Sequence, residues 1–143
     1  MNKIDEFKFA LEFPQVYLRK HFKDLRDQIN REAEKMCLTT NTKEVQIQIN
    51  SKKLAMVEIV DNLEKECLSD CDLIAENNLK QLNEIIISLD NKDEKEFNSR
   101  FTAYKRMLFH DKNLIFIHKI NVTGHLSDPT AFGKLVLVKK YNL

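Results

Sequence analysis

Glycine and proline are scarce in this sequence, with two of each among 143 residues. Both prolines (Pro14, Pro129) and both glycines (Gly124, Gly133) lie outside the stretch 15–123. Because proline and glycine are the strongest interrupters of regular structure, this long stretch favours helices and argues against a turn-rich β fold. It also excludes the phosphate-binding loops of P-loop and dinucleotide-binding proteins, which need closely spaced glycines.

Neither sign of charge predominates, with 23 basic and 22 acidic residues and a formal net charge of +1. Nucleic-acid binding needs a clustered basic face, so we expect no nucleic-acid partner. No apolar run approaches the ~20 residues of a membrane-spanning helix, and no polybasic segment is present, so we expect no membrane partner. The first residues include Asp5, Glu6 and Glu12, unlike a secretory signal peptide.

Cysteine is also rare, and its odd count of three shows no disulfide-framework spacing (Cys37, Cys67, Cys71). A reducing compartment, cytoplasmic or nuclear, follows as the expectation. Cys67 and Cys71 are four apart, on one face of a helix, which suits two thiolate ligands of zinc. No further ligand has supporting spacing, so we expect both to pack as small apolar side chains, with no metal and no cofactor. Thiol or metal chemistry with a histidine brought close by folding is the alternative.

No metalloprotease or nucleophile-elbow motif occurs, so we expect no catalytic residue and no enzyme activity. What the sequence does contain is helical apolar periodicity, beginning at Pro14. The first stripe consists of Leu18, Phe22, Leu25, Ile29 and Met36, spaced four, three, four and seven. Charged residues fill the gaps, as at a helix–helix seam. Replacing Phe22 and Ile29 by alanine should weaken self-association or unfold this helix, unless the stripe packs only inside one chain.

Four weak helix formers at 39–42 indicate a break in this helix. Val45, Ile47 and Ile49 alternate with polar residues, but we favour helix because Ile49 opens a second stripe. That stripe contains Ile49, Met56, Val60, Leu63, Cys67 and Ile74, and a third contains Leu68, Ala75, Leu79, Leu82, Ile86 and Leu89. The change of stripe indicates either a helix break near Ser69-Asp70 or different packing partners along one helix.

Leu79, Leu82 and Ile86 complete the predicted association seam. The run 85–87 consists of three isoleucines, and we expect it to be deeply buried because it is apolar on several faces. Residues 89–93 predict a turn, with Asp93 as the cap of the next helix and Glu96 three residues on. That helix presents Phe97, Phe101, Tyr104 and Leu108 and should end near residues 110–113.

The tail changes character, with short apolar runs at 114–117 and 132–138. Two such runs joined by a turn-rich link predict antiparallel strands. The fold class we expect is therefore mainly α, with long helices in a hairpin, coiled coil or bundle and a short C-terminal antiparallel β element. Residues 1–113 would form the helical region and residues 114–143 the β tail packed on it, as parts of one domain.

The segment Tyr17-Leu18-Arg19-Lys20-His21-Phe22-Lys23-Asp24-Leu25-Arg26-Asp27-Gln28-Ile29-Asn30 resembles the coiled-coil part of insect tripartite-motif-like proteins. In those proteins Phe-x-x-Leu-Arg-x-x-Ile opens a long helix. Phe132-Gly133-Lys134-Leu135 is similar to the end of such regions. The resemblance implies a dimerising region of a ubiquitin-ligase-like or adaptor protein. It implies no catalytic residue here, because the RING and B-box zinc patterns are missing.

Taken together, the stripes predict a non-catalytic module for self-association and protein interaction, a scaffold or adaptor acting through helical seams. The expected assembly is a homo-oligomer, most simply a dimer. The alternative is a peptide-binding adaptor in which a partner strand extends an open edge. That edge would consist of Leu135, Val136, Leu137 and Val138.

Overall fold

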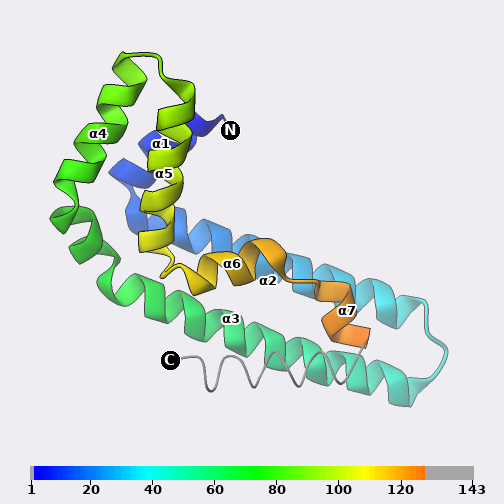
Figure 1. Ribbon diagram of the computed structural model, residues 1–143. Coiled ribbons are helices and arrows are strands. Elements are labelled where there is room, and N and C mark those ends of the chain that lie inside the picture. The colour runs from blue at the N-terminus through cyan, green and yellow to red at the C-terminus, as the bar shows by residue number, and fades with distance from the viewer. Residues whose placement is uncertain (1, 128–143) are drawn as a thin grey trace. The chain divides into compact units, whose positions relative to one another are not determined.

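The computed structural model describes residues 2–127, which form seven α-helices (Figure 1). In chain order these are α1 (Lys3–Glu12), α2 (Pro14–Leu38), α3 (Lys43–Asn77), α4 (Leu79–Asp90), α5 (Glu94–Leu108), α6 (Lys112–Lys119) and α7 (Val122–Ser127). The mainly helical class predicted from the scarcity of glycine and proline is confirmed. None of these helices combines the length and the apolar character that crossing a bilayer requires.

The chain divides into two compact units that interleave along the sequence. Within the described chain, unit 1 comprises residues 2–21 and 64–118, and unit 2 comprises residues 22–63 and 119–127. The long helices α2 and α3 each contribute residues to both units. The boundary expected at residue 113 remains a prediction.

Several helix ends lie where the sequence places them. Pro14 is the first residue of α2, where its fixed backbone angle suits the first helical turn. The segment 39–42 separates α2 from α3. Gln46 stabilises this connection, because its side-chain amide donates to the carbonyls of Cys37 and Thr40 at 3.0 and 3.1 Å. These bonds satisfy backbone acceptors that the end of α2 leaves without a helical partner.

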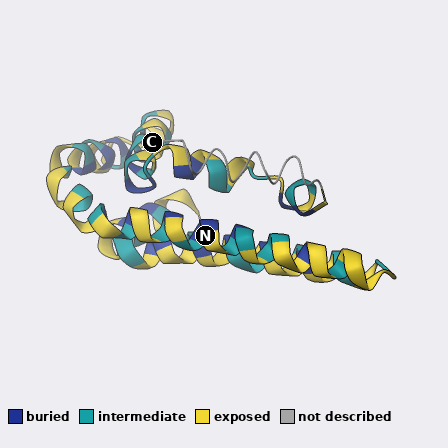
Figure 2. Cartoon of the chain, turned by 90° about the horizontal axis from the view of Figure 1, so that it is seen from below, coloured by how far each residue is buried: buried dark blue, intermediate teal, exposed yellow. Residues whose placement is uncertain are grey.

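Five of the six residues of the second stripe are buried on α3, from Ile49 to Cys67, and the sixth, Ile74, is half-buried. This helix runs unbroken through Ser69-Asp70 to Asn77, so the change of stripe reflects different surroundings along one helix rather than a break. The interruption comes instead at Asn78, whose side chain donates to the carbonyl of Ile74 at 2.7 Å. Figure 2 shows buried and exposed residues alternating along the long helices.

Unit 2 is built from residues 22–63, which form the part of the α2–α3 hairpin around its turn, and from α7. Arg26 pairs with Asp61 across the hairpin at 3.2 Å, and the Thr123 hydroxyl of α7 donates to the Glu32 carboxylate of α2 at 3.2 Å. The buried apolar core consists of Phe22, Leu25, Ile29, Ala33, Ile49, Met56, Ile59, Val60, Leu63, Val122 and Leu126. The first stripe therefore meets the second stripe within a single chain.

Unit 1 is held by a cluster of aromatic rings. Phe7 of α1 meets Phe97 and Phe101 of α5 edge-on, with centroid distances of 5.8 and 5.4 Å. The Tyr17 hydroxyl donates to the Glu6 carboxylate at 2.7 Å, which fixes α1 against the start of α2. Burial, and secondarily this hydrogen bond, raises the pKa of Tyr17. Offset and edge-on ring pairs add about 0.5–1.5 kcal/mol each beyond area burial, so α1 is an integral part of this unit.

The C-terminal antiparallel β element predicted from the sequence is wrong for the part that the structure describes. Residues 114–117, expected as its first strand, lie within α6. The expected second strand, 132–138, with the edge Leu135, Val136, Leu137 and Val138, lies outside the described residues. A four-residue apolar run has no period of its own, and a helix satisfies its backbone groups without a partner strand. Asn113 and Leu114 are buried as neighbours, which is helical rather than alternating burial.

Gly124, which falls in the link expected between the apolar runs 114–117 and 132–138, lies inside α7. A Cβ atom at this position would lie 2.7 Å from the side-chain amide of Asn121. The absence of that atom lets the Asn121 oxygen accept from the Gly124 backbone N–H at 3.0 Å. The glycine therefore makes room for a side-chain cap of a short helix.

Lys92, in the turn between α4 and α5, has a φ of 56°. The left-handed conformation costs residues with a Cβ atom about 1–2 kcal/mol relative to glycine. We therefore expect Lys92→Gly to raise the free energy of unfolding by about 1 kcal/mol, after the added flexibility of the unfolded chain offsets part of the relief. Lys95→Gly, inside α5, is the control and should lower it by about 1 kcal/mol. Chemical denaturation measures both, and a loss for Lys92→Gly would contradict the prediction.

Candidate interaction surface

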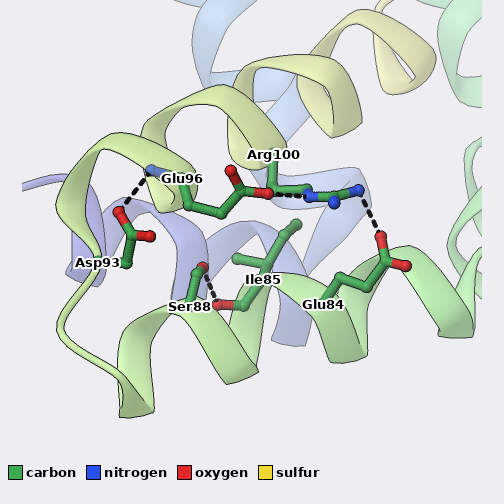
Figure 3. Close-up of polar contacts among 6 residues, drawn as sticks. All are labelled: Glu84, Ile85, Ser88, Asp93, Glu96 and Arg100. Carbon is green, nitrogen blue, oxygen red and sulfur yellow. Dashed lines mark hydrogen bonds and ion pairs between the residues drawn. The ribbon is translucent and has the colours of Figure 1, made fainter.

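The α4–α5 hairpin is the best-defined tertiary pair of unit 1 (Figure 1). Its turn is fixed by Asp93, whose carboxylate accepts the backbone N–H of Glu96 at 3.1 Å, as predicted for this cap (Figure 3). The Glu96 carboxylate does not reach back toward Asp93 but binds Arg100 at 2.6 Å. Arg100 also pairs with Glu84 of α4 at 2.5 Å, so one guanidinium links the two helices. The hydrogen bond that the Arg100 guanidinium donates to the Glu96 carboxylate raises the pKa of Arg100.

This pairing gives α4 two different faces. The inner face carries Leu82, Ile85 and Ser88, all buried, and the Ser88 hydroxyl donates to the Ile85 carbonyl at 2.6 Å (Figure 3). The outer face carries three large apolar residues that unit 1 leaves exposed. Leu79 is 63% exposed, Ile86 38% and Ile87 55%. We call Leu79, Ile86 and Ile87 the α4 outer row.

The predicted seam residues divide between the interior of the chain and its surface. Leu18, Phe22, Leu25, Ile29 and Leu82 are buried, Met36 is half-buried, and Leu79 and Ile86 are exposed. The first stripe is consequently largely covered within one chain, whereas Leu79 and Ile86 of the third stripe are exposed within residues 2–127. Helical periodicity identifies both stripes but does not show which of them the fold itself covers.

Ile87 is an apolar surface residue of α4 that the sequence interpretation missed. Three consecutive isoleucines suggested deep burial at 85–87, but only Ile85 is fully buried. Successive helical residues are rotated by roughly 100°, so a helix that packs on one side must leave part of such a run facing solvent. The sequence did contain an indication of this exposure, because the run 85–87 holds more apolar residues than one buried helical face can cover.

Two depressions flank the hairpin in unit 1. The larger, about 470 Å³, lies between the start of α1 and the α4–α5 turn, and Ile4, Leu89 and Phe97 are among its lining residues. The smaller, about 190 Å³, is lined by Glu84, Ile87, Ser88, Asn91, Asp93, Glu96 and Arg100. Ile87 thus connects the outer row to a shallow hollow with the Arg100 ion pairs in its wall.

Cys67 and Cys71, the candidate thiol ligands, are both buried in unit 1. The Cys67 sulfur accepts from the side-chain amide of Asn113 at 3.5 Å. His110 lies near this segment, but its Nε2 is 2.8 Å from Asp70 and its Nδ1 is 3.9 Å from Glu66. Among residues 2–127 no group of three or more histidine, cysteine and acidic side chains is arranged to hold a metal ion.

Burial, with a smaller contribution from the charge of Asp72, raises the pKa of Cys71 to about 11. Burial also raises the pKa of Tyr104 to about 12, and its hydroxyl has no hydrogen-bond partner within the described chain. The thiolate is the reactive form of cysteine, so the Cys71 thiol is protonated and unreactive near neutral pH.

Thiol labelling tests this assignment. At pH 7.5 we expect Cys37, which is only half-buried, to react first with a maleimide. Cys67 and Cys71 should react only as fast as the protein opens, because both are buried, and the raised pKa of Cys71 protects that thiol further. Peptide mass spectrometry gives the three rates, and urea-unfolded protein, in which all three should label, is the control. Similar native rates at all three sites would show that the buried thiols are accessible.

Comparison of the chain with protein-family models, curated protein sequences and solved structures finds no match. The resemblance to tripartite-motif-like proteins therefore remains an expectation.

Proposed function

We propose that this chain is a non-catalytic protein-interaction module that self-associates through the α4 outer row. The observation that carries the proposal is the exposure of Leu79, Ile86 and Ile87 on one face of a twelve-residue helix. Leu79 and Ile86 are seven residues apart, which is about two turns, so they lie on the same face, and Ile87 lies beside them at the edge of that face, about 100° around the helix from Ile86. Scattered exposed apolar residues are ordinary, but a row of three on one short helix is typical of a contact surface.

Energetics favour covering this row. Full burial of a leucine or isoleucine side chain is worth about 1.5–3 kcal/mol relative to exposure. The net charge of +1 imposes little repulsion between two copies of the chain. The first stripe offers no competing surface, because Phe22, Leu25 and Ile29 are already covered inside unit 2.

Replacing Leu79 and Ile86 together by aspartate tests the proposal. We expect the wild-type chain to sediment increasingly as a dimer as its concentration rises, and the double variant to remain monomeric, because buried carboxylates oppose the contact. Sedimentation equilibrium between 1 and 200 µM, a range of ordinary affinities, measures this. Circular dichroism establishes that the variant retains its helices.

Leu54→Asp is the matched control. Leu54 lies on α3 in unit 2 and is 64% exposed, nearly the same as Leu79 at 63%. This control should dimerise like the wild type, because it changes the same chemistry at a different site. A monomeric wild type across the whole range, or equal loss in the control, would contradict the proposal.

We also propose a cellular compartment and a family relationship for this scaffold or adaptor. All three cysteines are free thiols, in agreement with the reducing cytoplasm or nucleus that we propose as the compartment. The resemblance at Tyr17 to Asn30, if it reflects relationship, would make the chain a dimerising region of a ubiquitin-ligase-like or adaptor protein.

A further inference from the structure

The charges on α4 oppose the dipole of the helix. A helix carries partial positive charge at its N-terminus and partial negative charge at its C-terminus, so acidic residues suit its start and basic residues its end. α4 has no acidic residue in its first turn and no basic residue in its last turn. Lys80 stands in the first turn instead, and Asp90 is the last residue. The capping residue Asn78 makes no side-chain cap hydrogen bond.

The neighbouring helix α5 has the favourable arrangement. Asp93 caps it, Glu94 and Glu96 occupy its first turn, and Lys105 and Arg106 occupy its last. The reversed pattern is thus particular to α4 and not a property of the whole hairpin. Among the described residues neither Lys80 nor Asp90 forms an ion pair that would compensate for it.

Lys80 and Asp90 lie on the same side of α4 as the outer row. Both are exposed, and at roughly 100° per residue Asp90 falls within the arc that contains Leu79, Ile86 and Ile87, whereas Lys80 lies about 20° beyond the Ile87 edge of that arc. The row has a positive charge at one end and a negative charge at the other. Two copies of it that run in opposite directions therefore place opposite charges side by side at both ends. A second copy of the same helix, running antiparallel, would supply each end with the missing opposite charge.

We infer that the partner of the α4 outer row is the α4 outer row of a second copy, packed antiparallel about a two-fold axis. This inference rests on the proposed function and specifies its geometry. Lys80 of each copy pairs with Asp90 of the other, and the helix N-terminus lies beside the partner's C-terminus. A two-fold interface uses one patch twice, so both ion pairs form together.

Helix geometry sets the register. Lys80 of one copy lies level with Asp90 of the other when the two-fold axis passes at the height of Ile85. Each of the two residues is then about 7.5 Å from the axis, measured along the helix. The two Ile86 side chains then lie about 3 Å apart in height and contact each other beside the axis. The two Leu79 residues lie about 18 Å apart in height and do not meet.

Charge reversal tests the pairing. Lys80→Glu alone and Asp90→Lys alone should each weaken dimerisation about tenfold, because each turns two attractive pairs into two repulsive ones. The double variant Lys80→Glu/Asp90→Lys should recover wild-type affinity to within about threefold, since the pairs are restored with signs exchanged. Each single change also improves the fit of α4 to its own dipole, so weaker association should come without loss of helix content.

Cysteine cross-linking tests the orientation independently. In a Cys37→Ser background, Ile86→Cys should form an intermolecular disulfide under mild oxidation, whereas Leu79→Cys should not. A disulfide needs Cα atoms within about 7 Å, which only the position near the axis provides. Efficient cross-linking at Leu79 would indicate a parallel pair and overturn the inference.

The outcomes separate this inference from the proposed function. If the wild-type chain is monomeric, both fail. If it dimerises and the Leu79→Asp/Ile86→Asp variant does not, the proposed function stands. In that case, failure of the charge-reversed double variant to recover affinity would refute the antiparallel pairing alone.

Discussion

Phe22→Ala combined with Ile29→Ala is expected to unfold unit 2. Both side chains are fully buried in its core, and truncation to alanine costs about 3–5 kcal/mol for a phenylalanine and 2–5 kcal/mol for an isoleucine. The sum reaches the whole stability of an ordinary domain, about 5–15 kcal/mol. Hydrogen exchange resolved by peptide should show lost protection in residues 22–63, and circular dichroism should show lost helix.

The loss of structure in the Phe22→Ala/Ile29→Ala variant should not depend on dimerisation. We expect it to be equally large in the monomeric Leu79→Asp/Ile86→Asp background, because Phe22 and Ile29 are buried in the core of unit 2. Leu54→Ala, at an exposed site on α3, is the stability control and should change little. If the effect of the Phe22 and Ile29 changes vanished in the monomeric background, the stripe would belong to an intermolecular seam.

Phe101→Ala is expected to lower the free energy of unfolding of unit 1 by about 3–5 kcal/mol. Phe101 is almost fully buried, meets Phe7 edge-on at 5.4 Å and stacks on Phe97 at 5.8 Å. The Lys105 ammonium also lies 4.7 Å from the centre of its ring. The change removes contacts of α1, so α1 should exchange its amide hydrogens fastest of the unit 1 helices.

Phe13→Ala is the matched control for this change, because it removes the same side chain at a site that is 50% exposed. It should lower stability by about 1 kcal/mol or less. Urea denaturation followed by circular dichroism gives both values. Equal losses for Phe13→Ala and Phe101→Ala would show that the aromatic cluster is not the core of unit 1.

Much of the helical structure could be predicted from local chemistry. Pro14 begins α2, the polar segment 39–42 ends it, and Asp93 caps α5, because each acts on backbone groups within a few residues. The residues of the first two stripes are buried largely as expected, since a period near 3.6 puts them on one helical face. The helix α1 was not predicted.

The tail shows where local patterns failed. Residues 114–117 are rich in β-branched and aromatic side chains, which favour strands in the right surroundings, but they lie in α6. Strand propensity acts through pairing with a neighbour, and the sequence does not state whether a neighbour exists. Burial of Asn113 and Leu114 and the local helical hydrogen bonds decided the outcome.

The sequence by itself determined that the chain is helical, roughly where its helices begin and end, and which residues share a face. Only the tertiary structure decided which apolar face is covered. The fold buries Phe22, Leu25 and Ile29 inside unit 2 and leaves Leu79, Ile86 and Ile87 on the surface. The physical reason is that periodicity is a property of one helix, whereas burial depends on how many other helices pack around it, and α4 has a packing partner on its inner side but none among the described residues over its outer row.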